Sequence, residues 1–221
     1  MRHVEFDLPA GKSLGILGPS GAGKSSIAKI ILGIWKPTTG RVCIDGAELS
    51  QWDSERLGPH LGYLTQDVEL LPGTVAENIA RFRSEPSEGV VEAAKRAHAY
   101  EMILKLPQGF DTLLGEGGIQ LSAGQAQRVG LARALFGHPR LIILDEPNAN
   151  LDAEGEQALI ETLLLLKQEQ VTVVMITHKP SLVATLDYLM VIRDGKTELL
   201  GPCAEVLARL SGKTHQTAAI R

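Results

Sequence analysis

A strand, a glycine-rich turn and a helix follow one another near the beginning of this chain, and this order constrains the fold more than any other feature. The apolar run SLGILG at 13–18 predicts a buried strand. The segment GPSGAGKS at 18–25 comes next, and a helical pattern begins at Lys24. Strands that alternate with helices form a mostly parallel sheet with helices on both faces. The sequence therefore predicts an α/β fold.

The second half of the chain continues this alternation. Its predicted elements are, in order, a central strand LIILDE at 141–146, a helix at 154–170, a strand VTVVMIT at 171–177 and a strand YLMVIRDG at 188–195. The middle of the chain instead carries helical patterns, TVAENIARF at 74–82 and a longer one at 90–106. We interpret this middle part as an α-helical subdomain that is inserted into the α/β core.

The composition excludes several classes of protein. Of the 221 residues, 44% are hydrophobic, and the formal net charge is −4. A nucleic-acid-binding protein usually has a basic face, so we expect no nucleic acid partner. No window holds the ~20 apolar residues of a membrane span, and no signal peptide is evident. Cys43 and Cys203 match neither a disulfide framework nor a metal spacing. We expect a soluble, intracellular chain.

The segment GPSGAGKS fits the pattern G-x-x-x-x-G-K-[ST] of a phosphate-binding loop (P-loop). It follows a predicted strand and opens a predicted helix, which is the context that this pattern requires. Glycines let the backbone approach the phosphates, the lysine reaches the β- and γ-phosphates, and the serine hydroxyl binds Mg²⁺. An ordinary glycine-rich turn gives no reason for a lysine followed by a serine. The predicted nucleotide-binding residues are Gly18, Pro19, Ser20, Gly21, Ala22, Gly23, Lys24, Ser25 and Ser26, with Ser25 also a metal ligand.

The strand LIILDE ends in two carboxylates. In a parallel sheet, ligands bind at the C-terminal edge of the strands. We expect Asp145 to hold Mg²⁺ through its water shell, and Glu146 to orient or deprotonate a water that attacks the γ-phosphate. An apolar strand that ends in Asp-Glu is common, but together with the P-loop it predicts hydrolysis of ATP or GTP.

A series of sequence elements resembles, in content and order, the nucleotide-binding domain of ABC ATPases. The elements are GPSGAGKS, Gln66 in YLTQDVELL, LSAGQ at 121–125, LIILDE, NANLD at 148–152 and His178 in VMITHKP. The resemblance covers nearly the whole chain. It implies a P-loop NTPase core with a mostly parallel sheet, an antiparallel and partly truncated N-terminal β portion, and the inserted α-helical subdomain.

The resemblance also divides the chain. It implies one ABC ATPase domain over residues 1–221, with its core at 1–65 and 119–210. Residues 66–118 and the helix after LSAGQ would form the helical subdomain. The polar segment 211–221 is expected to be a flexible tail.

The resemblance assigns roles to the remaining motifs. Gln66 would contact Mg²⁺ and the attacking water and link the core to the helical subdomain. Glu146 would be the general base, and His178 would contact the γ-phosphate of ATP. Asp152 would bridge two subunits, although an aspartate at this place would also cap a helix that begins near Ala153.

The segment LSAGQ opens a helix, and helix N-termini attract anions. In ABC ATPases two domains pack head to tail, and this segment faces the nucleotide of the other subunit. The resemblance therefore implies a homodimer that buries two ATP molecules. Ser122, Gly124 and Gln125 of one subunit would contact the ATP of the other.

Finer features resemble exporters of the type I secretion class, which export proteases and related proteins from Gram-negative bacteria. These features are GTVAENIARF, GFDTLLGEGG and NANLDAEGE, and GEGG at 115–118 resembles the loop that senses the coupling helices. In that class a membrane domain precedes the ATPase on the same chain, so we expect this chain to be an excised or truncated domain. The implied partners are that transmembrane domain, a periplasmic adaptor and an outer-membrane channel. The implied location is the cytoplasmic face of the bacterial inner membrane.

Two features depart from the family pattern. The family has an aromatic residue upstream of the P-loop that stacks on adenine, whereas here Phe6 is the one aromatic before Gly18, in the strand-like stretch VEFDL. We expect Phe6 to belong to the core, and ATP affinity to be weakened because no aromatic residue would stack on adenine.

The family commonly has Gly-Gly at Ala123-Gly124 and a basic residue at Ala126. The Ala123 methyl group would crowd the partner's phosphate, so we expect reduced ATPase activity.

Two other functions fit parts of the pattern. Soluble ABC ATPases that act on ribosomes or DNA generally have paired domains with charged linkers, or long coiled-coil insertions, and this sequence has neither. A regulatory domain without turnover would fit best if Glu146 or His178 were missing, and both are present. The sequence favours the ATP-hydrolysing motor of a membrane exporter.

Overall fold

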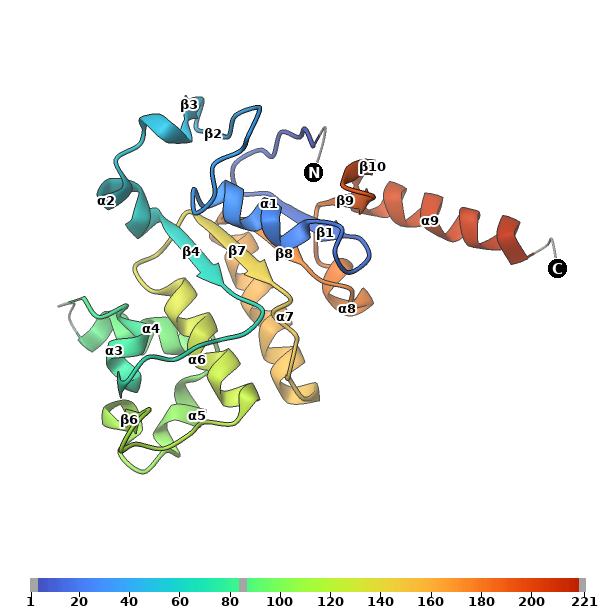
Figure 1. The fold of residues 1–221 in the computed structure, drawn as a ribbon. Coiled ribbons are helices and arrows are strands. Elements are labelled where there is room, and N and C mark those ends of the chain that lie inside the picture. Colours follow the sequence, from blue (N-terminus) through green and yellow to red (C-terminus); the bar gives the residue numbers. More distant parts are fainter. Residues whose placement is uncertain (1–3, 84–86, 219–221) are drawn as a thin grey trace.

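A computed structural model describes residues 4–83 and 87–218, without the side chains of Ser87 and 212–218. The strands are β1 Ser13–Leu17, β2 Cys43–Ile44, β3 Ala47–Glu48, β4 Leu61–Leu64, β5 Gly73–Thr74, β6 Leu113–Leu114, β7 Leu141–Asp145, β8 Thr172–Ile176, β9 Tyr188–Arg193 and β10 Lys196–Pro202. The helices are α1 Lys24–Ile31, α2 Ser54–Leu57, α3 Val75–Ile79, α4 Ser87–Arg96, α5 Tyr100–Leu104, α6 Ala123–Leu135, α7 Ala153–Gln168, α8 Pro180–Val183 and α9 Cys203–Ala218. Figure 1 shows their arrangement.

A six-stranded sheet in the order β10-β9-β1-β8-β7-β4 forms the centre of the molecule. All of its pairings are parallel except β9 with β10, which confirms the predicted mostly parallel sheet. Val174 of β8 lies opposite Leu14 of β1 and Ile143 of β7. Because β1, β8, β7 and β4 run in the same direction, their C-terminal ends meet at one edge of the sheet.

Helices cover both faces of this sheet. Ile143 and Val174 face a core cluster with α1, whereas Ile142 and Val173, one position earlier on the same strands, face a cluster with α6 and α7. Successive side chains of a strand point to opposite faces, and both faces here are buried. This burial explains why the strands are continuous apolar runs rather than alternating ones.

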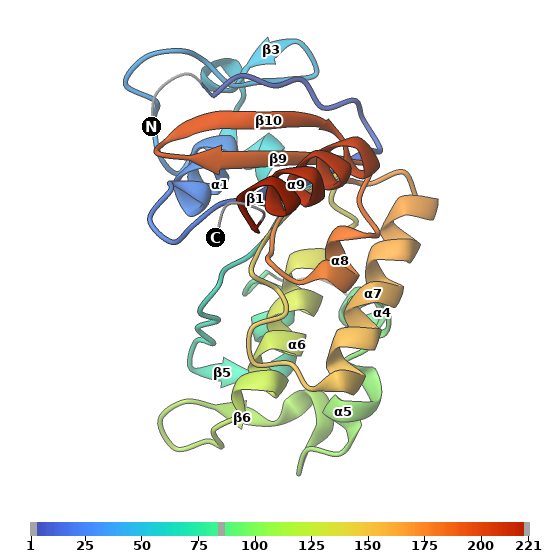
Figure 2. The same ribbon diagram turned by 90° about the vertical axis from the view of Figure 1, so that its right-hand side faces the viewer.

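Helices α3, α4 and α5 lie beside α6 and α7, away from β9 and β10 (Figures 1 and 2). The single helix expected over 90–106 is wrong, because α4 ends at Arg96 and α5 begins at Tyr100. Between them His98 has a left-handed backbone with φ +50°. The Ala99 N–H reaches back to the Ala94 carbonyl at 2.8 Å, which closes α4 as in a Schellman motif. No glycine or proline marks this break in the sequence.

The N-terminal segment differs from its expected strand. Residues 4–8 belong to no strand, and the turn from Pro9 to Lys12 follows them before β1 begins. Val4, Phe6 and Leu8 nevertheless pack against the core cluster of α1. The expectation that Phe6 contributes to the core is therefore confirmed.

The C-terminal segment 211–218, which the sequence predicts as part of a flexible tail, is helical in the structure. Helix α9 continues through 211–218, while 219–221 lie outside the described residues. Cys203, Val206 and Leu210 recur at helical spacing and pack beside β9, and no proline interrupts the helix. Figure 1 shows α9 extending away from the sheet. Within 4–83 and 87–218, none of the helices has the length and apolar character of a membrane span.

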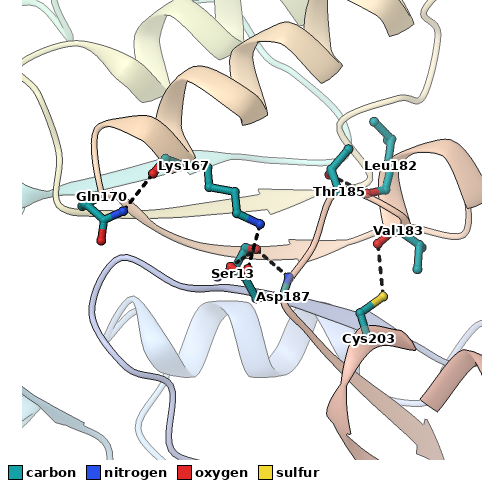
Figure 3. A network of polar contacts seen from close by, with 8 residues as sticks. All are labelled: Ser13, Lys167, Gln170, Leu182, Val183, Thr185, Asp187 and Cys203. Carbon is teal, nitrogen blue, oxygen red and sulfur yellow. Dashed lines mark hydrogen bonds and ion pairs between the residues drawn. The ribbon is translucent and has the colours of Figure 1, made fainter. Parts of the chain in front are cut away.

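Asp187, just before β9, ties three segments together (Figure 3). Its Oδ2 accepts hydrogen bonds from the Ser13 N–H at 3.0 Å and the Ser13 hydroxyl at 2.9 Å, and its Oδ1 lies 2.7 Å from Lys167 Nζ on α7. Burial raises the pKa of Asp187, but the bonds from Lys167 and Ser13 outweigh it and lower the pKa overall. These contacts fix the start of β1, the strand that leads into the P-loop.

Candidate functional site

The P-loop joins the end of β1 to the start of α1. Gly21 and Gly23 have left-handed φ angles of +77° and +97°, which glycine adopts at little cost. A Cβ atom on Gly18 would lie 2.4 Å from the Ile192 carbonyl oxygen, so no larger residue fits there. Lys24 Nζ donates to two carbonyl oxygens of the loop at 2.7 and 3.0 Å. A glycine-rich turn that opens a helix, with an ammonium group against it, has the elements of an anion site.

Asp145 ends β7 beside this loop. The residue is 3% exposed, and its Oδ1 has no hydrogen-bond partner among the described residues. Burial raises the pKa of Asp145, the Ser25 hydroxyl that hydrogen-bonds to it acts in the opposite direction, and the nearby Glu146 raises it further. A buried carboxylate oxygen without a partner, next to a serine hydroxyl, fits Mg²⁺.

Magnesium usually binds to one or two protein oxygens and completes its shell with water and substrate phosphates. Asp145 and Ser25 provide such oxygens at the foot of the P-loop. Among the described residues no group of three or more His, Cys, Asp or Glu side chains could hold a metal by itself. The donor set is therefore suited to a magnesium–nucleotide complex.

Glu146 lies directly after Asp145, and two side chains that follow other strands reach it. Gln66 Nε2 donates to Glu146 Oε2 at 3.3 Å, and His178 Nε2 lies 3.9 Å from Glu146 Oε1. Glu146 has a left-handed φ of +49°, and its N–H donates to the Ile176 carbonyl at 2.9 Å. Non-glycine residues in this backbone region are uncommon and concentrate at functional sites.

The sheet explains why these three residues meet. Gln66, Glu146 and His178 each come just after the end of β4, β7 and β8, respectively, and these strands are neighbours and parallel. The structure thus brings the predicted catalytic residues together, next to the predicted metal ligands.

The segment LSAGQ forms the start of α6. Ser122 is the N-cap: its Oγ accepts from the Gln125 N–H at 3.2 Å, while the Gln125 side chain accepts from the Ser122 N–H at 2.9 Å. This pair is a capping box. Gly124 lies close to a neighbouring loop, since a Cβ atom would be 3.0 Å from the Asn150 carbonyl oxygen. Ala123 begins the helix and is not among the residues with positive φ, so the alanine brings no backbone strain.

Asp152 caps α7, as one of its expected roles requires. Its Oδ1 accepts from the Gly155 N–H at 2.8 Å and lies 3.5 Å from an Arg128 guanidinium nitrogen. Arg128 on α6 also lies 3.5 Å from Glu154. The starts of α6 and α7 are therefore linked within one chain.

The two predicted phosphate-binding segments lie apart. Across 4–83 and 87–218, no hydrogen bond or ion pair joins Ser122, Gly124 or Gln125 to the P-loop. Figure 2 shows α1 in the upper part of the molecule and α6 in the lower part. The structure does not bring these residues together in one chain.

Sequence reasoning missed several polar contacts around the site. The Thr177 hydroxyl donates to Asn148 Oδ1 at 2.9 Å, and the buried Gln127 donates to the Pro147 carbonyl at 3.2 Å. Glu156 on α7 binds two residues that follow His178. The sequence signals one of these contacts, because Thr177 is a polar residue directly after an apolar strand.

Comparison with known proteins gives consistent matches. The family described as ABC transporter matches residues 1–149. The "Type I secretion system ATP-binding protein PrsD" of Rhizobium meliloti (strain 1021) is 51% identical over 94% of this chain and 36% of the relative. An "ATP-dependent lipid A-core flippase" of Vibrio cholerae is 38% identical over 95% of this chain and 36% of the relative.

A solved structure of a bacterial Atm1-family ABC exporter with ATP bound is similar, with a TM-score of 0.85 and 34% sequence identity. The match covers 98% of this chain and 38% of that chain. This chain thus spans a little over a third of the length of these relatives. The P-loop, the carboxylates at the end of β7 and the family match agree, and the chain belongs to the ABC transporter family, of which it carries the ATP-binding domain.

Proposed function

We propose that this chain binds ATP with Mg²⁺ and hydrolyses the ATP as the motor domain of an ABC exporter. The observation that carries the proposal is the position of Glu146, whose carboxylate lies between the Gln66 amide and the His178 imidazole at the P-loop edge of the sheet. A carboxylate held there is suited to accept a proton from an attacking water. Gln66 would orient that water, and His178 would contact the γ-phosphate.

The neighbouring groups would bind the substrate. The N–H groups of the P-loop and Lys24 would hold the β- and γ-phosphates, where their positive charge offsets the charge of the phosphates. Ser25 and Asp145 would hold Mg²⁺, which neutralises charge on the phosphates when it is bound. The unpartnered Asp145 oxygen supports this assignment. The remaining P-loop residues proposed to surround the phosphates are Gly18, Pro19, Ser20, Gly21, Ala22, Gly23 and Ser26.

The active form would be a head-to-tail dimer with two ATP molecules between the subunits. The N-terminus of α6 is remote from the P-loop of its own chain, which supports a role for Ser122, Gly124 and Gln125 at the nucleotide of the partner. Asp152, which lies at the start of α7, would contact the partner as well.

Type I protein secretion is the transport class that we propose. The 51% identity to the Rhizobium meliloti protein exceeds the 38% identity to the Vibrio cholerae flippase. A transmembrane domain, which the resemblance implies on the same polypeptide, would couple hydrolysis to export. A periplasmic adaptor and an outer-membrane channel would complete the pathway, and the chain would act at the cytoplasmic face of the bacterial inner membrane.

The variant Glu146→Gln tests the proposal. It retains the side-chain shape but accepts no proton, so we expect ATP turnover to fall by about 10²–10⁴-fold, the usual contribution of a general base. An ATP-bound dimer should accumulate and be visible by size-exclusion chromatography. The matched control is Glu154→Gln, a carboxylate with an 85% exposed side chain that should keep normal turnover.

Three outcomes would contradict parts of this function. Normal turnover in Glu146→Gln would contradict the role of Glu146 as general base. A variant that stays monomeric with ATP would contradict the proposed dimer. Co-purification of the chain with RNA or DNA would favour a soluble ABC ATPase instead of an exporter.

A further inference from the structure

A carboxylate outside the sequence motifs holds the segment that follows His178. Lys179 Nζ lies 2.9 Å from Glu156 Oε2, and the Ser181 hydroxyl donates to Glu156 Oε1 at 2.5 Å. Glu156 lies in the first turn of α7, and its side chain is only 20% exposed. Both oxygens of one carboxylate are thus bound to residues within three positions of His178.

The residue before His178 is held as well. The fully buried Thr177 donates its hydroxyl to Asn148 Oδ1 at 2.9 Å and accepts from the Lys179 N–H at 3.2 Å. His178 itself has a 53% exposed side chain, and its nitrogen lies 3.9 Å from Glu146, beyond hydrogen-bond distance. The position of the imidazole therefore depends on the backbone at either side of it.

We propose that Glu156 is a positioning residue for His178, and that it acts by anchoring Lys179 and Ser181 to the first turn of α7. This inference rests on the proposed contact of His178 with the γ-phosphate. The hydrogen bond from Ser181, with a further contribution from Lys179, lowers the pKa of Glu156, so the carboxylate stays charged near neutral pH.

A variant of the neighbouring Glu154 distinguishes this positioning role from a general effect of negative charge at the start of α7. Acidic side chains in the first turn of a helix interact favourably with the helix dipole, and Glu154 and Glu156 both lie there. Glu154, however, contacts Arg128 on α6 and has an 85% exposed side chain. A variant at Glu154 therefore removes the same charge from the same turn without freeing the His178 segment.

Steady-state ATPase kinetics of the 221-residue chain test the proposal. Since a misplaced catalytic group costs up to about a hundredfold in rate, we expect Glu156→Ala to lower kcat about tenfold at an unchanged KM for ATP. Glu156→Gln, which retains an acceptor for Ser181, should lose less. Glu154→Ala should keep normal kcat.

Combining Glu156→Ala with His178→Ala tests whether Glu156 affects kcat through His178. If Glu156 acts through His178, the double variant His178→Ala/Glu156→Ala should have the same kcat as His178→Ala. A further tenfold loss in the double variant would overturn the inference and leave the proposed function in place. Normal turnover in His178→Ala would show that the assigned role of His178 is wrong, and the inference would fall with it.

Hydrogen–deuterium exchange supplies a readout that does not depend on turnover. We expect faster exchange of the backbone amides at 179–183 in Glu156→Ala and in Glu156→Gln, and no change there in Glu154→Ala. Equal exchange in all variants would overturn the inference, because the segment would then be held without Glu156.

Discussion

The Gln66 side-chain amide donates to the Glu146 carboxylate at 3.3 Å, although 80 positions of the sequence separate the two residues. Gln66 follows β4 and Glu146 follows β7, and these two strands are parallel neighbours. Gln66 also begins the segment that leads from β4 to α3. A movement of α3 relative to the sheet would therefore displace Gln66 from the proposed general base.

The variant Gln66→Ala should lower ATP turnover about ten- to a hundredfold, because the carboxylate and the attacking water lose a group that positions them. Gln66 is exposed, so the free energy of unfolding should change by less than about 0.5 kcal/mol. ATPase rates and urea unfolding measure the two effects. Gln157→Ala, an exposed glutamine that contacts Glu161 on α7, is the control. Equal rates in the two variants would contradict a role for Gln66.

The raised pKa of Asp145 predicts how the free energy of unfolding changes with pH. Burial raises its pKa above the ordinary value of 3.8, so the folded chain keeps a proton where the unfolded chain has released it. The contribution of Asp145 to the free energy of unfolding therefore falls as the pH rises from 3.8 through the raised pKa. Asp145→Asn, which does not titrate, should gain stability relative to the natural chain across this window and hold a constant difference above it.

Urea unfolding of both chains between about pH 3 and pH 8 measures this difference. The same variant should lose the stabilisation that Mg²⁺ adds to the ATP-bound chain, since a carboxylate oxygen is a preferred ligand for Mg²⁺. A difference that shrinks as the pH rises would mean that Asp145 is more easily ionised in the folded chain, and would contradict the burial argument.

The sheet and the edge that carries the site could be predicted from the sequence. A continuous apolar run such as that of β7 predicts a strand buried on both faces, and the ends of parallel neighbours meet at one edge. Asp145 and Glu146 could therefore be placed before any contact was known. The strand expected at residues 4–8 did not form, although Val4, Phe6 and Leu8 pack against the core cluster of α1.

The contacts that hold the site could not be predicted. Periodicity indicates which face of a helix is buried, but it does not identify the partner of a polar side chain. Glu156 lies in an acidic first turn like that of many helices, and only the fold brings Ser181 against it. The break at His98 depends on a backbone hydrogen bond of Ala99, for which the sequence has no glycine signal.

Arg81 follows α3 and joins this helix to α6 and β4, and its replacement should destabilise the chain. Its guanidinium donates to the carbonyls of Arg133 at 3.0 Å, Leu61 at 3.1 Å and Ala134 at 3.2 Å. Arg81→Met would leave these carbonyls unpaired. We expect the free energy of unfolding to fall by about 3 kcal/mol, since each hydrogen bond to a charged group contributes ~1.5–3 kcal/mol without full additivity. Arg83→Met, at a nearby exposed arginine, is the control.

Urea unfolding should show a lower midpoint for Arg81→Met with an unchanged dependence on denaturant. Hydrogen–deuterium exchange should increase at the end of α6 and at the start of β4, where the lost carbonyl partners lie. Equal midpoints for the Arg81 and Arg83 variants would contradict this role.

The variant Ala123→Gly tests whether the signature segment is crowded. Ala123 has an ordinary backbone at the start of α6, so backbone strain would not lower the activity, and we propose that its methyl group crowds the partner's phosphate instead. Removing it should raise ATP turnover a few-fold. Because glycine is a poorer helix former, the free energy of unfolding should fall by up to about 1 kcal/mol. Ala153→Gly makes the same change at the start of α7 and should destabilise the chain without raising turnover. Lower turnover in Ala123→Gly than in the natural chain would contradict crowding at this position.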